Sequence, residues 1–120
     1  MKVKETVLFT MDKKETAEFY TNILGLRTIA EGNNHIEFEG NLIFADSDVW
    51  KEILGSHDIT LGAHEALLCF EENNFDDFLE RIKAYRLIYI HPEGYEGLRM
   101  VRFYDPDMHM IEVQESLTIK

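Results

Sequence analysis

The amino-acid sequence predicts an α+β fold made of two tandem modules, each with the element order strand, helix and three strands. Three observations support this prediction: short β-forming segments bounded by turn sequences, two segments with helical periodicity, and the same element order in both halves. A length of 120 residues with 45% hydrophobic content suits one core. We therefore expect a single domain over residues 1–120, with module one at 1–46, a connector at 47–61 and module two at 62–120.

The first module is expected to begin with a strand over residues 3–10, which are rich in β-forming side chains. Asp12, with Glu15 three positions later, has the pattern of a helix N-cap. Gly25 is the residue type that commonly follows a helix end. Between them, apolar or small side chains recur every three or four positions, at Thr16, Phe19, Tyr20, Ile23 and Leu24. A helix is therefore expected over residues 13–24.

Three short strands should follow this helix, at residues 26–30, 35–39 and 41–45. They are separated by glycine and asparagine sequences at 32–34 and 40–41, which favour or tolerate positive φ. The connector has apolar side chains at helical spacing, followed by a glycine, at Trp50, Ile53 and Leu54. A short helical turn is therefore expected within the connector.

The second module repeats this order, beginning with a strand at 65–70. Asn73 or Asn74 is expected to cap a helix whose core face would consist of Phe78, Leu79, Ile82 and Tyr85. The remaining strands are expected at 86–91, 98–104 and 109–114, with the turn Asp105-Pro106-Asp107 between the last two. Placing one half on the other aligns Glu5 with Glu65.

The composition argues against several functional classes. The chain carries 23 acidic and 12 basic residues, a formal charge of -11, so nucleic acid and acidic membrane surfaces would be repelled. Cys69 is the single cysteine, which excludes an intrachain disulfide and a paired-cysteine metal site. The opening residues lack the apolar run of a signal peptide, and no run reaches the roughly 20 apolar residues of a membrane helix. A cytoplasmic protein is expected.

Two motifs resemble those of a known superfamily. Residues 102–113, Arg-Phe-Tyr-Asp-Pro-Asp-Met-His-Met-Ile-Glu-Val, resemble the closing hairpin of the glyoxalase, bleomycin-resistance and extradiol dioxygenase (vicinal oxygen chelate) superfamily. Residues 18–26 resemble the end of that superfamily's first helix. The resemblance implies a curved mixed sheet around a cleft, a small-molecule ligand and a homodimer. Met108 stands where the superfamily has glycine, which implies a different turn or a strained one costing about 1 kcal/mol.

The resemblance also implies positions for a divalent metal, which many members bind and others lack. Carried onto this chain, the ligand positions fall at Glu5, Phe44, Glu65 and Glu112. Phe44 has no donor atom, and an oxygen-only set favours Mg²⁺, Mn²⁺ or Ca²⁺ over Zn²⁺. The expected cofactor is therefore either none or one divalent cation among Mg, Mn, Ni, Ca and Zn. Glutamates at strand starts are also typical of an acidic surface.

Strand alternation groups the side chains that would line the cleft. An apolar wall suited to a flat ligand would comprise Phe9, Leu42, Phe44, Leu67 and Met110, although the same residues could pack at a dimer interface. Arg102 and Tyr104, on one face with Met100, are also expected to bind the ligand. Arg102 could hold a carboxylate or phosphate, or form a salt bridge to a cleft glutamate. Trp50 is interpreted as a lid over the cleft or an anchor for its loop.

Histidine offers less support for a site. No paired ligand spacing connects His35, His57, His64, His91 and His109. His64 precedes Glu65, so a register shift by one residue would turn the imidazole into the cleft and the carboxylate out.

Two functions remain open from the sequence. The first is a metal-independent protein that binds an aromatic or cationic small molecule in an apolar, acid-rimmed cleft, as the resemblance to bleomycin-resistance proteins implies. The alternative is a divalent-metal lyase, isomerase or dioxygenase-like enzyme that uses Glu5, Glu65 and Glu112, with a carboxylate such as Glu112 moving a proton. Nucleophilic catalysis has no support, because none of Ser47, Ser56 and Cys69 has an evident base partner.

Overall fold

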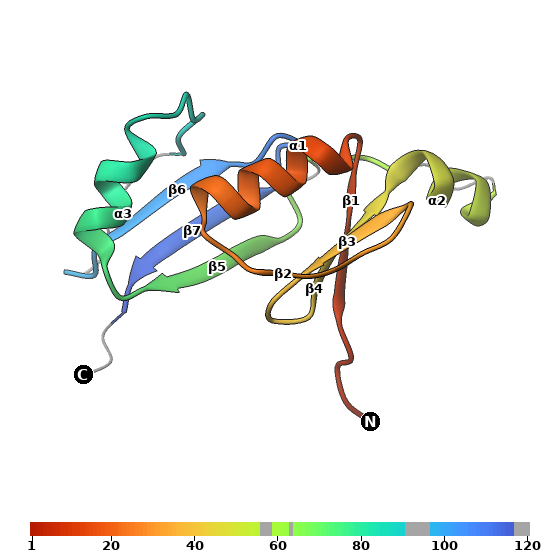
Figure 1. Cartoon of the computed structure of the whole chain (residues 1–120), viewed down its shortest axis with the longest axis horizontal. Helices are drawn as coiled ribbons and strands as arrows, with labels where there is room; N and C mark the ends of the chain where they lie inside the picture. Colours follow the sequence, from red (N-terminus) through yellow and green to blue (C-terminus); the bar gives the residue numbers. More distant parts are fainter. Residues whose placement is uncertain (56–58, 63, 91–96, 117–120) are drawn as a thin grey trace. The chain divides into compact units, whose positions relative to one another are not determined.

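The computed structural model describes residues 1–55, 59–62, 64–90 and 97–116. Contacts divide the chain into two compact units, Met1–Leu61 and Gly62–Lys120. Each unit contains one mixed β-sheet and helical segments (Figure 1). The predicted α+β class is thereby confirmed. Among the described residues, no helix is long and apolar enough to cross a membrane.

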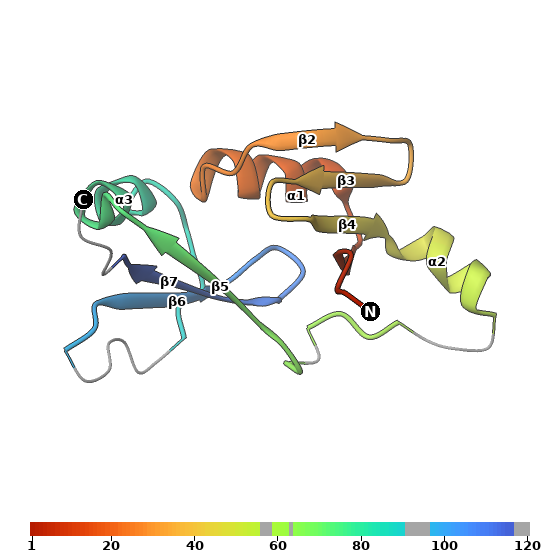
Figure 2. The ribbon, with the colours of Figure 1, turned by 90° about the horizontal axis from the view of Figure 1, so that it is seen from below.

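The first unit has a four-stranded sheet in the order β1-β4-β3-β2. The bounds of these strands are β1 Thr6–Thr10, β2 Thr28–Glu31, β3 His35–Phe38 and β4 Leu42–Asp46. β1 runs parallel to β4, and the other neighbours are antiparallel. Figures 1 and 2 show helix α1, Lys13–Glu18, running along one face of this sheet.

The first helix forms for the local reasons that the sequence indicates. Asp12 is its N-cap, and an Oδ1 atom of its side chain accepts a hydrogen bond from the Glu15 backbone N–H at 3.2 Å. The helix continues as a π-helical segment, η1 Phe19–Ile23, and Gly25 follows with φ 72°. The π-helical turn was not predicted, because no residue type in this stretch marks it.

The core of the first unit lies between this helix and the sheet. The ring of Tyr20 packs 4.6 Å from that of Phe44 and 5.5 Å from that of Phe38, measured between centroids. All three side chains have 0% exposure. The connector forms helix α2, Ser47–Leu54, whose N-cap Asp46 accepts from the Asp48 backbone N–H at 2.9 Å. The helical turn expected in the connector is therefore present.

The second unit has a three-stranded sheet in the order β5-β7-β6. The bounds of its elements are β5 Leu67–Glu72, helix α3 Phe75–Ile82, β6 Met100–Tyr104 and β7 Met110–Glu115. β5 runs parallel to β7, and β6 runs antiparallel to it. Phe78 of α3 packs on Phe103 with 6.4 Å between ring centroids. Phe103, Ile111 and Val113, which alternate along their strands, are almost fully buried.

Two expectations for the second unit need correction. The strand expected at 86–91 is reduced to an isolated bridge between Tyr89 and Phe103. Ile90 donates to the Arg102 carbonyl at 2.9 Å and Tyr104 donates to the Ile88 carbonyl at 3.0 Å, a pairing too short for a regular ladder. Residue 91 lies outside the described residues. Tyr85, expected in the core, is 39% exposed, because helix α3 ends at Ile82.

Candidate functional site

The face of the second sheet that points away from α3 carries the predicted site residues of its three strands. Strand register places Cys69 beside Glu112 and Glu112 beside Arg102. The next row toward the β6–β7 turn consists of Leu67, Met110 and Tyr104. We call these two rows, together with the flanking Met100 and Gln114, the Glu112 face. Side chains two positions apart share a face, so the alternation in β6 and β7 matches the arrangement expected from the sequence.

Glu112 is the centre of this face, and only 5% of the residue is exposed. Its Oε1 atom accepts a hydrogen bond from Arg102 Nε at 2.7 Å, which is also a salt bridge. Its Oε2 atom accepts from the side-chain amide of Gln114 and, at 3.7 Å, from Cys69 Sγ. Donors on three strands thus converge on one carboxylate. Arg102 was expected either to bind an anion or to form a salt bridge to a cleft glutamate, and the structure shows the salt bridge to Glu112.

These contacts change the titration of two groups. Burial alone would raise the pKa of Glu112, but hydrogen bonds from Gln114 and Arg102 and the charge of Arg102 together lower that pKa below its ordinary value. The pKa of the Cys69 thiol is raised, first by burial and then by the charge and hydrogen bond of Glu112, against a lowering by Arg102. The carboxylate is therefore the stable anion of this site and the thiol remains protonated at neutral pH.

The apolar row of the Glu112 face lies beside an aromatic stack. The His64 ring stacks on that of Tyr104 with centroids 5.3 Å apart and an interplanar angle of 27°. His64 adopts a positive φ of 59°, and Leu67 is 42% exposed. The expected wall residues Leu67 and Met110 and the expected ligand-binding Tyr104 thus share one row. Leu67 and the stacked His64 are exposed to solvent.

The β6–β7 turn forms a second polar cluster, which sequence reasoning missed. Asp105 Oδ1 accepts from the backbone N–H groups of Asp107 at 2.9 Å and His109 at 2.8 Å, and Asp105 Oδ2 lies 2.7 Å from His109 Nδ1. Ligand atoms of Asp105, Asp107 and His109 lie within 4.8 Å of one another. Both oxygens of Asp105 hold the turn in shape, so its side chain has a structural role. The spacing Asp-x-Asp-x-His was the available signal.

The metal implied by the resemblance does not fit the residues at Glu112. Both oxygens of that carboxylate accept hydrogen bonds, and the Arg102 guanidinium would repel a divalent cation. Glu65 is exposed and precedes β5, whereas Glu112 is nearly buried in the middle of β7.

The predicted site residues of the first unit have different environments. Phe44 is fully buried against Tyr20 on the helix side of its sheet, so the prediction that it lines a cleft is wrong. Leu42, buried with it, fails for the same reason, because the side chains of β4 that face the other way are Ile43 and Ala45.

The remaining candidates of the first unit lie outside its core. Phe9 is half-buried and its ring lies 5.8 Å from that of Trp50, measured between centroids. Trp50 thus anchors helix α2 to β1, as one of its two interpretations proposed. Glu5 precedes β1 and lies 3.9 Å from Lys4 Nζ. Two of the weaker histidine candidates, His57 and His91, lie outside the described residues.

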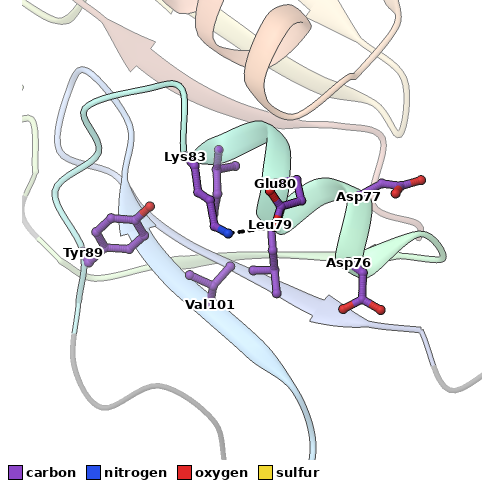
Figure 3. Close-up of a pocket in the computed structure, with 8 residues that line it drawn as sticks. Asp76, Asp77, Leu79, Glu80, Lys83, Tyr89 and Val101 are labelled. Atoms are coloured by element: carbon purple, nitrogen blue, oxygen red, sulfur yellow. Dashed lines mark hydrogen bonds and ion pairs between the residues drawn. The ribbon is translucent and has the colours of Figure 1, made fainter.

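A groove of about 590 Å³ lies beside α3, on the opposite side of the second sheet (Figure 3). Its apolar lining includes Leu79, Ile82 and Val101. Tyr89 stands at one end. The charged groups on its rim are largely paired: Asp76 with Arg99 at 2.8 Å and Glu80 with Lys83 at 2.7 Å. No predicted site residue lines this groove. Exposed pairs of this kind are ordinary on helix surfaces and indicate no ligand.

Comparison with known proteins assigns the family. A structure of a protein of unknown function from Agrobacterium tumefaciens str. C58 is 28% identical, with a TM-score of 0.84, over 98% of this chain and 95% of that chain. A lactoylglutathione lyase from Agrobacterium tumefaciens is 20% identical, with a TM-score of 0.72, over 96% of this chain and 93% of that one.

A fosfomycin resistance protein from Mesorhizobium loti is 18% identical, with a TM-score of 0.65, over 96% of this chain and 92% of that one. No curated protein sequence matches significantly. The glyoxalase-like domain model matches residues 3–118. This chain therefore belongs to the glyoxalase-like domain family.

Proposed function

We propose that the chain binds a small molecule with an apolar body on the Glu112 face and that it does so without a metal ion. The observation that carries this proposal is the ion pair between Arg102 Nε and Glu112 Oε1 at 2.7 Å. A carboxylate bound by a guanidinium, an amide and a thiol already has its charge and its hydrogen bonds satisfied. A divalent cation would have to displace the half-buried Arg102 from its ion pair, which favours metal independence.

The apolar part of the ligand would lie on the row formed by Leu67, Met110 and Tyr104. An exposed leucine beside a half-buried methionine and tyrosine offers apolar area that a small molecule would remove from water. The names of two similar structures, a lactoylglutathione lyase and a fosfomycin resistance protein, also refer to small molecules. Glu112 is nearly buried and neutralised, so it gives no support to the acid-rimmed, cation-binding form of the prediction.

Metal analysis tests the metal-independent part. Protein purified without chelator should contain no stoichiometric metal by mass spectrometry, and its melting temperature should not rise with Mg²⁺, Mn²⁺, Ca²⁺, Ni²⁺ or Zn²⁺. A stoichiometric ion that is lost in Glu112→Gln would overturn the proposal and favour the metal-dependent lyase or isomerase. A shift that is lost in His109→Asn instead would assign the ion to the β6–β7 turn and leave the proposal intact.

A ligand screen tests the binding part. Titration of small aromatic compounds, followed by backbone amide chemical shifts, should perturb β5, β6 and β7 at Leu67, Tyr104 and Met110. Perturbations confined to the α3 groove would contradict the proposed location. The proposal also includes a cytoplasmic homodimer, as the family resemblance implies, and sedimentation at micromolar concentration should give the dimer mass.

A further inference from the structure

The exposed member of the buried ion pair is the cation. The side chain of Arg102 is 22% exposed, whereas that of Glu112 is 7% exposed. A molecule that reaches the Glu112 face therefore contacts the guanidinium, while the carboxylate lies beneath it. On a chain with a formal charge of -11, this position presents a local positive charge.

Arg102 is also held in one orientation before any ligand binds. Its Nε atom is bonded to Glu112 on the neighbouring strand, and its Nη2 atom lies 2.9 Å from Met100 Sδ. A side chain that is already ordered loses little rotamer freedom on binding. A planar guanidinium, in turn, is geometrically matched to carboxylate and phosphate oxygens.

The other charged and polar groups on this face allow an anion to approach. Cys69 and Gln114 are neutral donors that already bond to Glu112. Besides Glu112 of β7, this face carries the carboxylate of Glu71 on β5, and the register neighbour of Glu71 is Gln114. Glu71 is exposed, and it is two strands away from Arg102, a lateral distance of about 10 Å at which salt largely screens the repulsion.

We infer that the ligand of the Glu112 face presents a single anionic oxygen group, a carboxylate or a phosphate, to Arg102, with its apolar body on the row of Leu67, Met110 and Tyr104. This inference rests on the proposed function and names the ligand class for the same site. Arg102 is then a specificity-determining residue, and Glu112 is a positioning residue that acts through it.

Three probes of the same shape test this inference: 4-phenylbutyrate, 4-phenylbutanol and 4-phenylbutylamine, titrated against the full chain and followed by amide chemical shifts. The carboxylate probe should bind at least about tenfold more tightly than the alcohol, because neutralisation of Arg102 by Glu112 leaves a modest preference for anions. The amine should bind most weakly. All shifts should map to β5, β6 and β7.

Variants separate charge from structure. Arg102→Met should remove the preference for the carboxylate and leave alcohol binding unchanged, and Arg102→Lys should retain part of it. The double variant Arg102→Met with Glu112→Gln leaves no buried charge and should bind the probes as Arg102→Met does. It replaces the single variant in the test if Arg102→Met does not fold. Arg86→Met, which removes an exposed charge of the same unit, is the matched control and should change nothing.

The outcomes are distinguishable. Equal binding of all three probes on this face, or a preference for the amine, would overturn the anionic ligand while the proposed binding function stands. A carboxylate preference that persists in both Arg102→Met variants would overturn the role of Arg102. No binding by any probe at about 10 mM, where even millimolar affinity would be visible, would overturn both.

Discussion

Gly62 and Met108 are packed so closely that a Cβ atom on the glycine would lie 2.8 Å from the Cβ atom of the methionine. Both residues have positive φ values, 69° for Gly62 and 66° for Met108. The strained turn expected where methionine replaces glycine is therefore present, and the segment entering β5 accommodates the methionine by having no side chain at this contact. The β6–β7 turn and the start of β5 depend on each other through this pair.

Gly62→Ala should destabilise the chain more than Gly40→Ala does. Both glycines have a positive φ, 69° and 82°, which costs an alanine about 1 kcal/mol at either position, but at Gly40 no atom of the described residues lies within 4 Å of the added atom. The excess at Gly62, about 1 to 3 kcal/mol, would measure overpacking against Met108. Urea unfolding of the two variants gives the comparison, and equal losses would contradict the contact.

Met108→Gly should relieve this coupling. Removing the side chain at a positive φ is expected to offset part of its lost packing, and Gly62→Ala should then cost no more than Gly40→Ala. A double-mutant cycle by urea unfolding measures the coupling. Additive effects of the two substitutions would show that the residues do not interact.

Replacing only one partner of the Arg102–Glu112 ion pair should lower the free energy of unfolding. Arg102→Met leaves a nearly buried carboxylate without its cation, for which a loss of about 3 kcal/mol in the free energy of unfolding is expected. Replacing both partners, by Arg102→Met with Glu112→Gln, should recover most of that loss because no charge remains. The check is chemical denaturation of the single and double variants. If the double variant lost the sum of the single losses, the pair would not be coupled.

Acid should weaken the fold through Glu112. Because the pKa of Glu112 is lower in the folded chain than its ordinary 4.5, its contribution is present above that pH and is lost as the pH falls through the folded-state value. The unfolding midpoint in urea should therefore decline below about pH 4.5 more steeply for the wild type than for the double variant. Parallel declines would contradict the assignment, since the carboxylates paired with Arg99 are common to both proteins.

Cys69 should react slowly with alkylating reagents although it is exposed. Its raised pKa keeps the thiolate fraction low, so carboxamidomethylation by iodoacetamide at pH 8 should be slower than that of free cysteine. Glu112→Gln should accelerate the reaction and Arg102→Met should slow it, because the first removes a nearby negative charge and the second a positive one. Effects of the same sign in both variants would indicate local opening instead.

Alternation along single strands was enough to predict which side chains of β6 and β7 share a face. It does not specify which residues of two strands lie opposite each other, so the pairing of Arg102 with Glu112 remained one of two alternatives until the register was known. The hydrogen bond from the Gln114 amide to Glu112 was also not predicted. Alternation places the two side chains on one face of β7, but it does not show that the amide turns back toward Glu112.

Phe44 was misassigned because a continuous apolar run such as Leu-Ile-Phe-Ala has no alternation that marks its buried side. The helix determines which side of β4 is buried, because it packs against the even-numbered side chains of that strand. Phe44 therefore lies against Tyr20. The prediction of a strand at 86–91 was wrong for another reason. Its β-forming residues make one bridge to β6, at Tyr89, and this bridge does not extend into a ladder.

The convergence of Arg102, Gln114 and Cys69 on one carboxylate also bears on how this chain can evolve. Any lineage that exchanged Arg102 or Glu112 alone would pass through a form with an unpaired charge in the sheet, and such intermediates are disfavoured by selection for folding. Substitutions here should consequently occur in sets, with arginine and glutamate gained or lost together among descendants. Covariation of positions 102 and 112 would be the historical trace of that constraint.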